Sequence, residues 1–186
     1  MSALKLMAAA VALAALVTAS APSFAGTSKQ VPASAAVATA LAPLTEPEIA
    51  TLKWMREEEK LARDVYIELN TYWPAQIFVQ IADSEQRHFD ALGEKLALYG
   101  IPDPALPGVG VYADPRLQAL HDELLAAGMV SYVDALEVGV TIEETDIVDL
   151  QAAIDATTSA PLQLTYQNLL DGSVRHLASF LKLLDR

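Results

Sequence analysis

The sequence contains no cysteine, and only 3 of its 186 residues are histidine. The lack of cysteine excludes disulfide bonds, thiolate metal sites and cysteine nucleophiles. Basic residues are also scarce, because 12 lysines and arginines stand against 24 acidic residues, a formal net charge of −12. This balance argues against a protein that binds nucleic acid, which needs a basic face. It suits the attraction of cations, and the chain is long enough for one domain with a substantial core.

The first 25 residues have the features of a cleavable secretory signal. Lys5 supplies a positive charge, residues 6–17 form an unbroken apolar run, and small residues lead up to Ala25. The apolar run is too short for a permanent membrane anchor, so we expect cleavage near Ala25 and a periplasmic or secreted protein. An uncleaved anchor is the alternative. Residues 26–44 are rich in Ala, Ser, Thr, Val and Pro and are expected to form a flexible linker.

From residue 45 onward the chain has helical periodicity, and no segment shows the sustained alternation of a strand. Caps and breakers delimit four long helices and one short helix, over residues 45–72, 75–99, 116–127, 131–156 and 161 to near the C-terminus. Very short turns join the first two and the last two long helices, so each pair is expected to form an antiparallel hairpin. About thirty residues join the hairpins, enough to cross the length of a bundle. We therefore predict an all-α domain over residues 45–186, a ferritin-like four-helix bundle whose long crossover carries the short helix.

Glu85 and His88 are three residues apart in the second long helix and therefore share one face of it. Phe78, Ile81 and Leu92 recur at helical spacing on that same face, which marks it as buried. The carboxylate and the imidazole are thus expected to point into the core, where an unpaired charge is unfavourable. An inward Glu-x-x-His pair forms half of the site in carboxylate-bridged di-iron and di-manganese bundles. A buried histidine bonded to its neighbour is the alternative.

The first long helix offers two further carboxylates beside its apolar face. Glu58 and Glu59 both flank this face, and Glu59 is the better ligand candidate because it precedes Tyr66 by two turns on one stripe. The outer face of the same helix carries charged residues that are expected to be solvated. These residues are Glu57, Lys60, Arg63, Asp64 and Glu68.

The last two long helices carry polar residues in similar positions. Glu143 falls within an apolar line, Glu144 borders it, and Asp146 is expected to lie more to the side. His176 lies on the apolar face of the final helix. His121, in the short helix, faces no acidic stripe and is expected to be a surface or packing residue.

These groups are expected to share one level of the bundle, because a residue at mid-helix stays at mid-height, within roughly 5–10 Å, whichever way its helix runs. Converging carboxylates would repel one another and hold protons unless cations joined them. Oxygen and imidazole ligands without sulfur suit two iron ions, with manganese as the alternative, although zinc and copper would also bind. The candidate metal ligands are Glu58, Glu59, Glu85, His88, Glu143, Glu144 and His176.

Three segments together resemble a known family: MREEEKLARDVY at residues 55–66, SEQRH at residues 84–88 and IEETDI at residues 142–147. They are similar to the ferritin and rubrerythrin superfamily and, within it, to the ferritin-like family catalogued as domain of unknown function 2202. The resemblance covers about residues 46–184. It implies a ferritin-like four-helix fold and a dinuclear metal site, without implying a substrate.

The fourth long helix departs from that pattern. Ferritin-like proteins usually carry a second Glu-x-x-His there, whereas this chain has Ser173 in the position of the glutamate that precedes His176. Glu144, Glu58 or Asp146 is expected to supply the missing carboxylate, unless the second metal position is weak or empty.

The leading functional prediction is an exported oxidoreductase, ferroxidase-like or peroxidase-like, whose partners are metal ions and O2 or peroxide. Tyr66 is the candidate catalytic residue, as a redox-active or hydrogen-bonding neighbour of the metals. One alternative is a periplasmic protein that binds or sequesters a cation without turnover. Another is a structural bundle with a relic polar core. Whether the chain forms a homo-oligomer is left open.

Overall fold

The computed structural model describes residues 41–185, and every regular element in this part is a helix. The elements are α1 (Glu46–Tyr72), α2 (Gln76–Leu98), α3 (Pro115–Gly128), α4 (Tyr132–Ala156) and α5 (Ala160–Leu184). The predicted all-α bundle is confirmed, and each helix begins and ends close to its expected limits. The predicted signal segment and nearly all of the predicted linker lie outside the described residues. No helix among residues 41–185 has the length and apolarity needed to cross a membrane.

Local chemistry explains the ends of the helices. Thr45 caps α1 through a capping box, because its backbone N–H donates to Glu48 while the Glu48 N–H donates to its hydroxyl. The same Glu48 carboxylate accepts a hydrogen bond of 2.6 Å from Thr157, at the turn between α4 and α5. Ser131 and Ser159 cap α4 and α5. The start of the first hairpin is thereby tied to the turn of the second.

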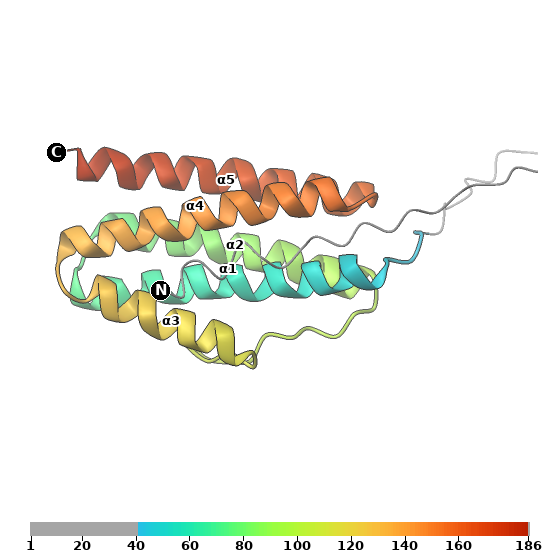
Figure 1. Cartoon of the computed structure of the whole chain (residues 1–186), viewed down its shortest axis with the longest axis horizontal. Helices are drawn as coiled ribbons and strands as arrows, with labels where there is room; N and C mark the ends of the chain where they lie inside the picture. Colours follow the sequence, from blue (N-terminus) through green and yellow to red (C-terminus); the bar gives the residue numbers. More distant parts are fainter. Residues whose placement is uncertain (1–40, 186) are drawn as a thin grey trace, which may run out of the picture.

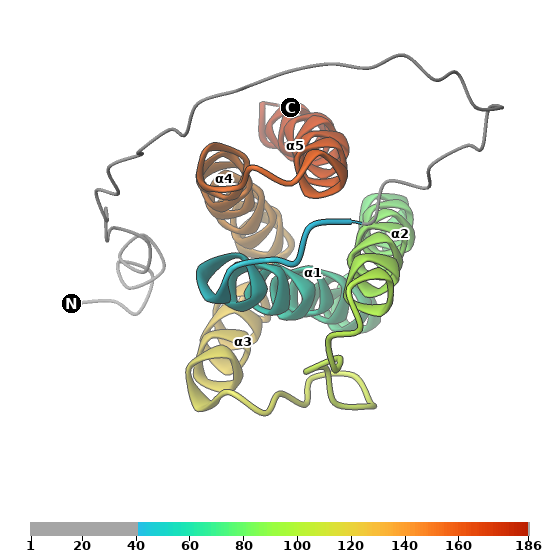
Figure 2. The same ribbon diagram turned by 90° about the vertical axis from the view of Figure 1, so that its right-hand side faces the viewer.

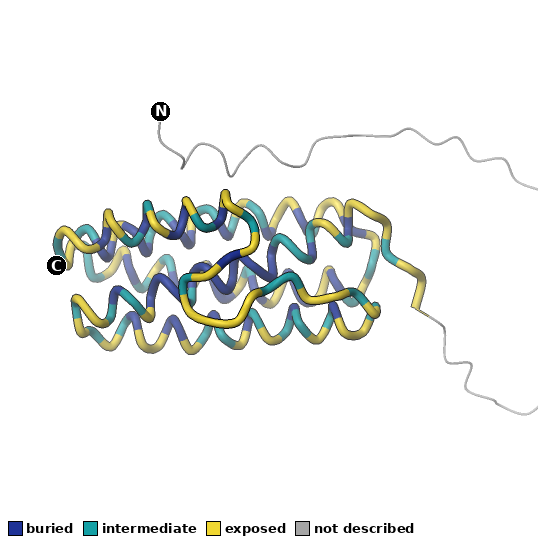
Figure 3. The backbone as a smooth tube through the Cα atoms, turned by 90° about the horizontal axis from the view of Figure 1, so that it is seen from below, coloured by how far each residue is buried: buried dark blue, intermediate teal, exposed yellow. Residues whose placement is uncertain are grey.

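The helices form two antiparallel hairpins, α1 with α2 and α4 with α5, that pack against each other (Figure 1). Viewed from the end, these four helices surround a common interior, and α3 lies outside them against α1 and α4 (Figure 2). The chain between α2 and α4 crosses the length of the bundle and carries α3, as predicted. Buried positions recur along the inward sides of the helices (Figure 3).

The apolar interior is divided into two clusters by a polar layer. One cluster contains Tyr66, Phe78 and Phe180, and the other contains Leu52 and Leu92, all fully buried. Each long helix contributes apolar residues to both clusters and a buried polar residue where the helix passes from one cluster to the other. The polar layer is therefore enclosed by apolar side chains on both sides along the bundle axis.

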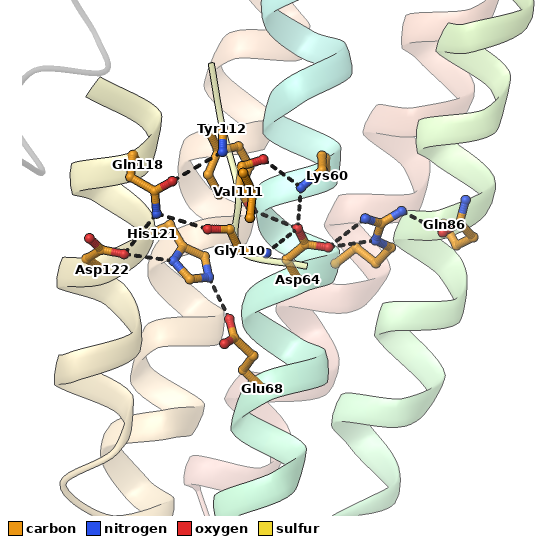
Figure 4. A network of polar contacts seen from close by, with 11 residues as sticks. Lys60, Asp64, Glu68, Gln86, Gly110, Val111, Tyr112, Gln118, His121 and Asp122 are labelled. Carbon is orange, nitrogen blue, oxygen red and sulfur yellow. Dashed lines mark hydrogen bonds and ion pairs between the residues drawn. The ribbon is translucent and has the colours of Figure 1, made fainter. Parts of the chain in front are cut away.

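The prediction of a solvated outer face on α1 is wrong. Asp64 is 0% exposed and Lys60 is 2% exposed, because α3 and the crossover cover them. Lys60 Nζ donates to Asp64 Oδ2 over 2.6 Å and to the Val111 carbonyl over 3.1 Å (Figure 4). Asp64 also accepts hydrogen bonds from the Tyr112 hydroxyl and the Gly110 N–H. The charges on this face hold the crossover against the bundle.

Candidate metal centre

The polar layer consists of five buried side chains from the four long helices. Their exposed fractions are 1% for Glu59 in α1, 1% for Glu85 and 8% for His88 in α2, 1% for Glu143 in α4 and 9% for His176 in α5. These five residues belong to the set of candidate ligands predicted from the sequence. The structure brings them together at the centre of the four helices that Figure 2 shows from the end.

The five side chains form two groups that share one residue. Glu59, Glu85 and His88 make the first group, and Glu85, Glu143 and His176 make the second. Within each group the three ligand atoms lie within 4.8 Å of one another. Ligand atoms that bind one cation at about 2.0–2.2 Å lie at most about 4.4 Å apart, so each group is close to the spacing that one ion requires.

The Glu85 carboxylate divides its two oxygens between the two groups. Its Oε1 lies 2.7 Å from His176 Nδ1, and its Oε2 lies 2.8 Å from His88 Nδ1. Despite these distances, neither oxygen has a hydrogen bond of acceptable geometry to any of residues 41–185, and neither has His176 Nδ1. Buried oxygen and nitrogen atoms that lie this close together without a well-aligned hydrogen bond need another partner, and a cation bound between them would be one. The two imidazole rings are stacked, with centroids 5.5 Å apart.

The two histidines hold protons when no cation is bound. Burial by itself would lower the pKa of His88, but Glu59 and Glu85 raise this pKa to about 11. Burial likewise opposes the charge of His176, whose pKa Glu143 and Glu85 raise to about 9. Burial would raise the pKa of Glu85, yet the two histidines lower it to about 2. Glu85 is therefore the ionised partner of two imidazolium groups.

The other acids of the layer behave in the opposite way. Burial raises the pKa of Glu143 to about 8, and the Glu85 charge adds to this effect. Burial, and then the charge of Asp146, raises the pKa of Glu59 well above its ordinary value. These carboxyl groups hold protons where cations would otherwise balance their charge. The prediction of self-repelling acids therefore applies to Glu59 and Glu143 and does not apply to Glu85.

Tyr66 is fully buried beside the second group. Its hydroxyl donates a hydrogen bond of 2.6 Å to Glu143 Oε1. Burial and the Glu143 charge raise the pKa of Tyr66 well above its ordinary value, so the phenol keeps its proton. The structure thus places the candidate catalytic residue in direct contact with a candidate ligand.

Two acidic residues on α4 lie in positions that are the reverse of those predicted. Glu144 is exposed, whereas Asp146 is only 8% exposed and accepts a hydrogen bond of 2.5 Å from the Ser173 hydroxyl. The expectations that Glu144 borders the buried face and that Asp146 lies to the side were wrong. Asp146 is the carboxylate that occupies the neighbourhood of the missing glutamate, and Ser173 holds it there. Burial, and then the Glu85 charge, raises the pKa of Asp146 to about 7.

The rotation of α4 about its axis explains this exchange. The small residue Gly139 faces α5 so closely that a Cβ there would lie 2.5 Å from Phe180 Cε1. The larger Val140 and Ile147, which lie at helical spacing on either side of Glu143, are only partly buried. Glycine marks the close contact, but it contributes little to a pattern read from large apolar side chains.

The candidate ligand Glu58 and the third histidine, His121, lie outside both groups. Glu58 is buried but points into a different pocket. His121 is 3% exposed, lies on α3 and contacts Glu68 Oε2 over 2.6 Å and Asp122 Oδ1 over 3.1 Å. The expectation that His121 faces no acidic residues is wrong, because Glu68 of α1 contacts its ring. The predicted packing role agrees with its buried position.

Sequence reasoning did not connect Gly172 with His88. A Cβ at this position would lie 2.5 Å from His88 Nε2, so the ring of His88 occupies the space beside the α5 backbone. The only sequence signal is a glycine next to Ser173 within a helical pattern, where glycine is unfavourable unless a close approach requires it.

The fold and the site together define the class of protein, which is an all-α bundle with a buried layer of carboxylates and imidazoles. The chain belongs to the family described as an uncharacterized protein domain (DUF2202), whose model matches residues 48–186. This agrees with the narrower of the two resemblances noted in the sequence.

The chain is similar to one further protein both in sequence and in structure. The chain is 45% identical over 144 residues to the uncharacterized protein MJ0754 of Methanocaldococcus jannaschii, covering 77% of this chain and 78% of that protein. It also resembles the crystal structure of the hypothetical protein MJ0754 from Methanococcus jannaschii, with a TM-score of 0.76 and 45% identity, covering 77% of this chain and 83% of that one.

Proposed function

We propose that the protein is a ferritin-like oxidoreductase whose polar layer binds two cations, iron in first place and manganese as the alternative. Its reaction is the oxidation of Fe(II) or a reaction with O2 or peroxide. The ferritin-like assignment is supported by the three sequence segments and by the long crossover between two hairpins. Periplasmic or secreted localisation, with cleavage near Ala25, stays a prediction from the sequence.

The observation that carries this proposal is the divided carboxylate of Glu85. One oxygen is 2.7 Å from His176 Nδ1 and the other is 2.8 Å from His88 Nδ1, without hydrogen-bond geometry at either oxygen. A glutamate used only as a hydrogen-bond acceptor would align with the N–H of its partners. A glutamate that bridges two ions presents one oxygen to each.

The donor set suits the proposed metals. Each group supplies two carboxylates and one imidazole, with Glu85 counted in both, and the chain has no cysteine that would favour a soft metal. Three protein ligands leave coordination positions open for water or a substrate, as in catalytic sites. When bound, such a pair of cations would supply Lewis acidity and electrons to O2 or peroxide.

The side chains of the chain itself orient the site and hold its protons. Tyr66 fixes the direction of Glu143 by donating a hydrogen bond of 2.6 Å from its hydroxyl to Oε1. Ser173 fixes Asp146 in the same way from α5. The apolar clusters above and below the layer limit the access of water, which strengthens the electrostatic interactions within it.

Metal counting and oxygen consumption test this proposal. Wild-type protein, Glu85→Ala and the matched control Glu144→Gln should be titrated anaerobically with Fe(II), followed by elemental analysis. We expect two ions at the centre of the wild type and the control, a near-complete loss from this centre in Glu85→Ala, and consumption of O2 or peroxide only by the first two.

Two other results would contradict the proposal in different ways. Tight binding of metal without consumption of O2 or peroxide would favour a protein that sequesters a cation. Equal and weak binding by all three proteins would favour the structural bundle with a relic polar core.

A further inference from the structure

The polar layer has an outer edge between α2 and α5, which lie side by side at one edge of the bundle (Figure 2). The side chains of His88 in α2 and His176 in α5 are 10% and 11% exposed. The three carboxylates of the layer are enclosed, with side-chain exposures of 0% or 1%. The exposed part of the layer therefore belongs to its imidazole rings.

The two ring nitrogens of His88 have different surroundings. Nδ1 faces the layer, 2.8 Å from Glu85 Oε2 and 3.3 Å from Glu59 Oε2. Nε2 faces α5, where a Cβ on Gly172 would lie 2.5 Å from it, and it has no hydrogen-bond partner among residues 41–185. A histidine that binds a metal ion through one nitrogen usually donates from the other to a carboxylate, a carbonyl or water. Nε2 of His88 lacks such an acceptor within the described part of the chain.

This nitrogen is a donor whether or not a cation occupies the layer. A neutral imidazole that binds a cation through Nδ1 carries its hydrogen on Nε2, and a protonated ring carries one hydrogen on each nitrogen. The hydrogen on Nε2 is thus present in the loaded centre and in the metal-free centre.

Arg175 brings a second donor to the same place. Its Nη2 lies 3.9 Å from the position of that Cβ on Gly172, so Nη2 and His88 Nε2 are separated by at most the sum of the two distances. Two charge-assisted hydrogen bonds of about 2.7–2.9 Å, with a small anion between them, span such a separation. Arg175 is exposed, and its guanidinium forms no ion pair or hydrogen bond with any of residues 41–185. It stays unpaired there although the chain has 24 acidic and 12 basic residues.

We propose that Arg175 and His88 Nε2 bind one small oxyanion or carboxylate at the edge of the polar layer between α2 and α5. The planar guanidinium matches the oxygens of such anions, and Nε2 adds a donor from the other helix. The absence of a side chain on Gly172 lets the ring approach the α5 backbone close to Arg175. Anion binding at this site does not depend on the proposed function.

The bound anion also supports the centre, and this second step rests on the proposed function. An acceptor at Nε2 holds the ring of His88 with Nδ1 facing the cation and makes Nδ1 a more basic ligand. Anion and cation then strengthen each other's binding, because the coupling between two binding sites is reciprocal.

Calorimetric titration of the metal-free protein with sodium sulfate, against sodium chloride at equal ionic strength, tests the anion site. The proteins are the wild type, Arg175→Gln, Arg175→Lys and the matched control Lys182→Gln, which removes a positive charge from an exposed position two turns further along α5. We expect one sulfate per chain in the wild type and the control. The affinity should be at least tenfold lower in Arg175→Gln and intermediate in Arg175→Lys. Thermal melts of all four proteins should agree, because the Arg175 side chain is exposed.

Nuclear magnetic resonance of protein labelled with ¹⁵N histidine tests the part played by His88. Sulfate should shift the assigned Nε2 signal of His88 in the wild type and in Lys182→Gln, and should leave it unchanged in Arg175→Gln. Equal sulfate affinity in wild type and Arg175→Gln, or no saturable binding in the wild type, would overturn the anion site. Binding that needs Arg175 but does not move the His88 signal would overturn the role of Nε2.

Titration with Mn²⁺, followed by electron paramagnetic resonance in sulfate or in chloride, tests the coupling to the centre. We expect sulfate to tighten Mn²⁺ binding about tenfold in the wild type and in Lys182→Gln, at the low end of the effect of a ligand's supporting partner, and not in Arg175→Gln. An unchanged Mn²⁺ affinity in the sulfate-bound wild type would overturn the coupling. A wild type that binds sulfate but no Mn²⁺ would overturn the proposed function and leave the anion site standing.

Discussion

Glu85 Oε1 in α2 lies 2.7 Å from His176 Nδ1 in α5, while the other oxygen of the same carboxylate lies 2.8 Å from His88 Nδ1. One side chain therefore contacts both halves of the polar layer and joins the two helical hairpins at mid-height. The charge of this carboxylate is therefore balanced on both sides, by protonated histidines in the metal-free protein or by cations when they are bound. The predictions below follow from this relationship and from the residues that support it.

In the metal-free protein, Glu85→Gln should be strongly destabilising at pH 7, whereas Glu143→Gln should not. Glu85 is the anion that two buried imidazolium groups share, and its loss leaves them unbalanced, which costs about 3–5 kcal/mol for a buried pair. Glu143 already holds a proton at that pH, because burial raises its pKa to about 8. Denaturant unfolding in the presence of a chelator measures both values. Equal destabilisation would show that the two acids do not differ in charge.

The metal-free wild type should lose stability as pH rises from about 4.5 to about 9. The native state binds more protons than the unfolded state wherever a pKa is raised, so stability falls with pH in that window. For Glu143 the window runs from 4.5 to about 8, and for His176 from 6.5 to about 9. Glu143→Gln removes the first contribution and weakens the second, so its melting temperature should depend less steeply on pH. Parallel curves for the two proteins would contradict these shifts.

Gly172→Ala should weaken metal binding about 10–100-fold, the usual effect of disturbing the support of a ligand. The added Cβ would lie 2.5 Å from His88 Nε2 and would push the imidazole away from Glu85. The matched control is Gly128→Ala, whose Cβ would lie 2.6 Å from Leu69 Cδ2, remote from the centre. Both variants should melt earlier than wild type, but only Gly172→Ala should lose affinity in a calorimetric titration. A similar affinity in both would place His88 outside the centre.

Tyr66→Phe and Tyr166→Phe remove the same atom from two buried tyrosines with different surroundings. The Tyr66 hydroxyl donates 2.6 Å to Glu143, whereas the Tyr166 hydroxyl has no hydrogen-bond partner among the described residues. We expect Tyr66→Phe to cost about 1–3 kcal/mol of stability and Tyr166→Phe to be neutral or stabilising. Urea unfolding of both variants measures the difference, and a larger loss in Tyr166→Phe would be the contrary result.

Filling the centre should release protons. His88 and His176, with pKa values raised to about 11 and about 9, must each lose a proton before they can bind a cation at neutral pH. Titration calorimetry in buffers of different ionisation enthalpy should therefore show at least two protons released per chain at pH 7, and metal affinity should rise with pH. Binding without proton release would mean that the imidazoles are not ligands.

The sequence predicted the helices, the two hairpins and the meeting of Glu59, Glu85, His88, Glu143 and His176. It could do so because polar residues interrupt long apolar stripes near the middle of each helix, and helix length fixes their height. The caps at Thr45, Ser131 and Ser159 are local, so they too are visible in sequence.

The errors concern features that depend on packing between elements. The positions of Glu144 and Asp146 depend on the rotation of α4, which small residues such as Gly139 set through close contact with Phe180. The charges around Asp64 have the spacing of a solvated face, and only the position of α3 and the crossover makes them buried. No local pattern distinguishes these cases, because the covering residues are far away in sequence.

The central claim is that the Glu85 carboxylate bridges two cations, and anomalous X-ray diffraction from crystals loaded with Fe²⁺ or Mn²⁺ tests it most directly. We predict two anomalous peaks about 3.5–4 Å apart, the spacing of two-metal sites, one on each side of Glu85. The first should lie among Glu59, Glu85 and His88, and the second among Glu85, Glu143 and His176. A loaded crystal with a single peak in this layer, or with none, would contradict the claim.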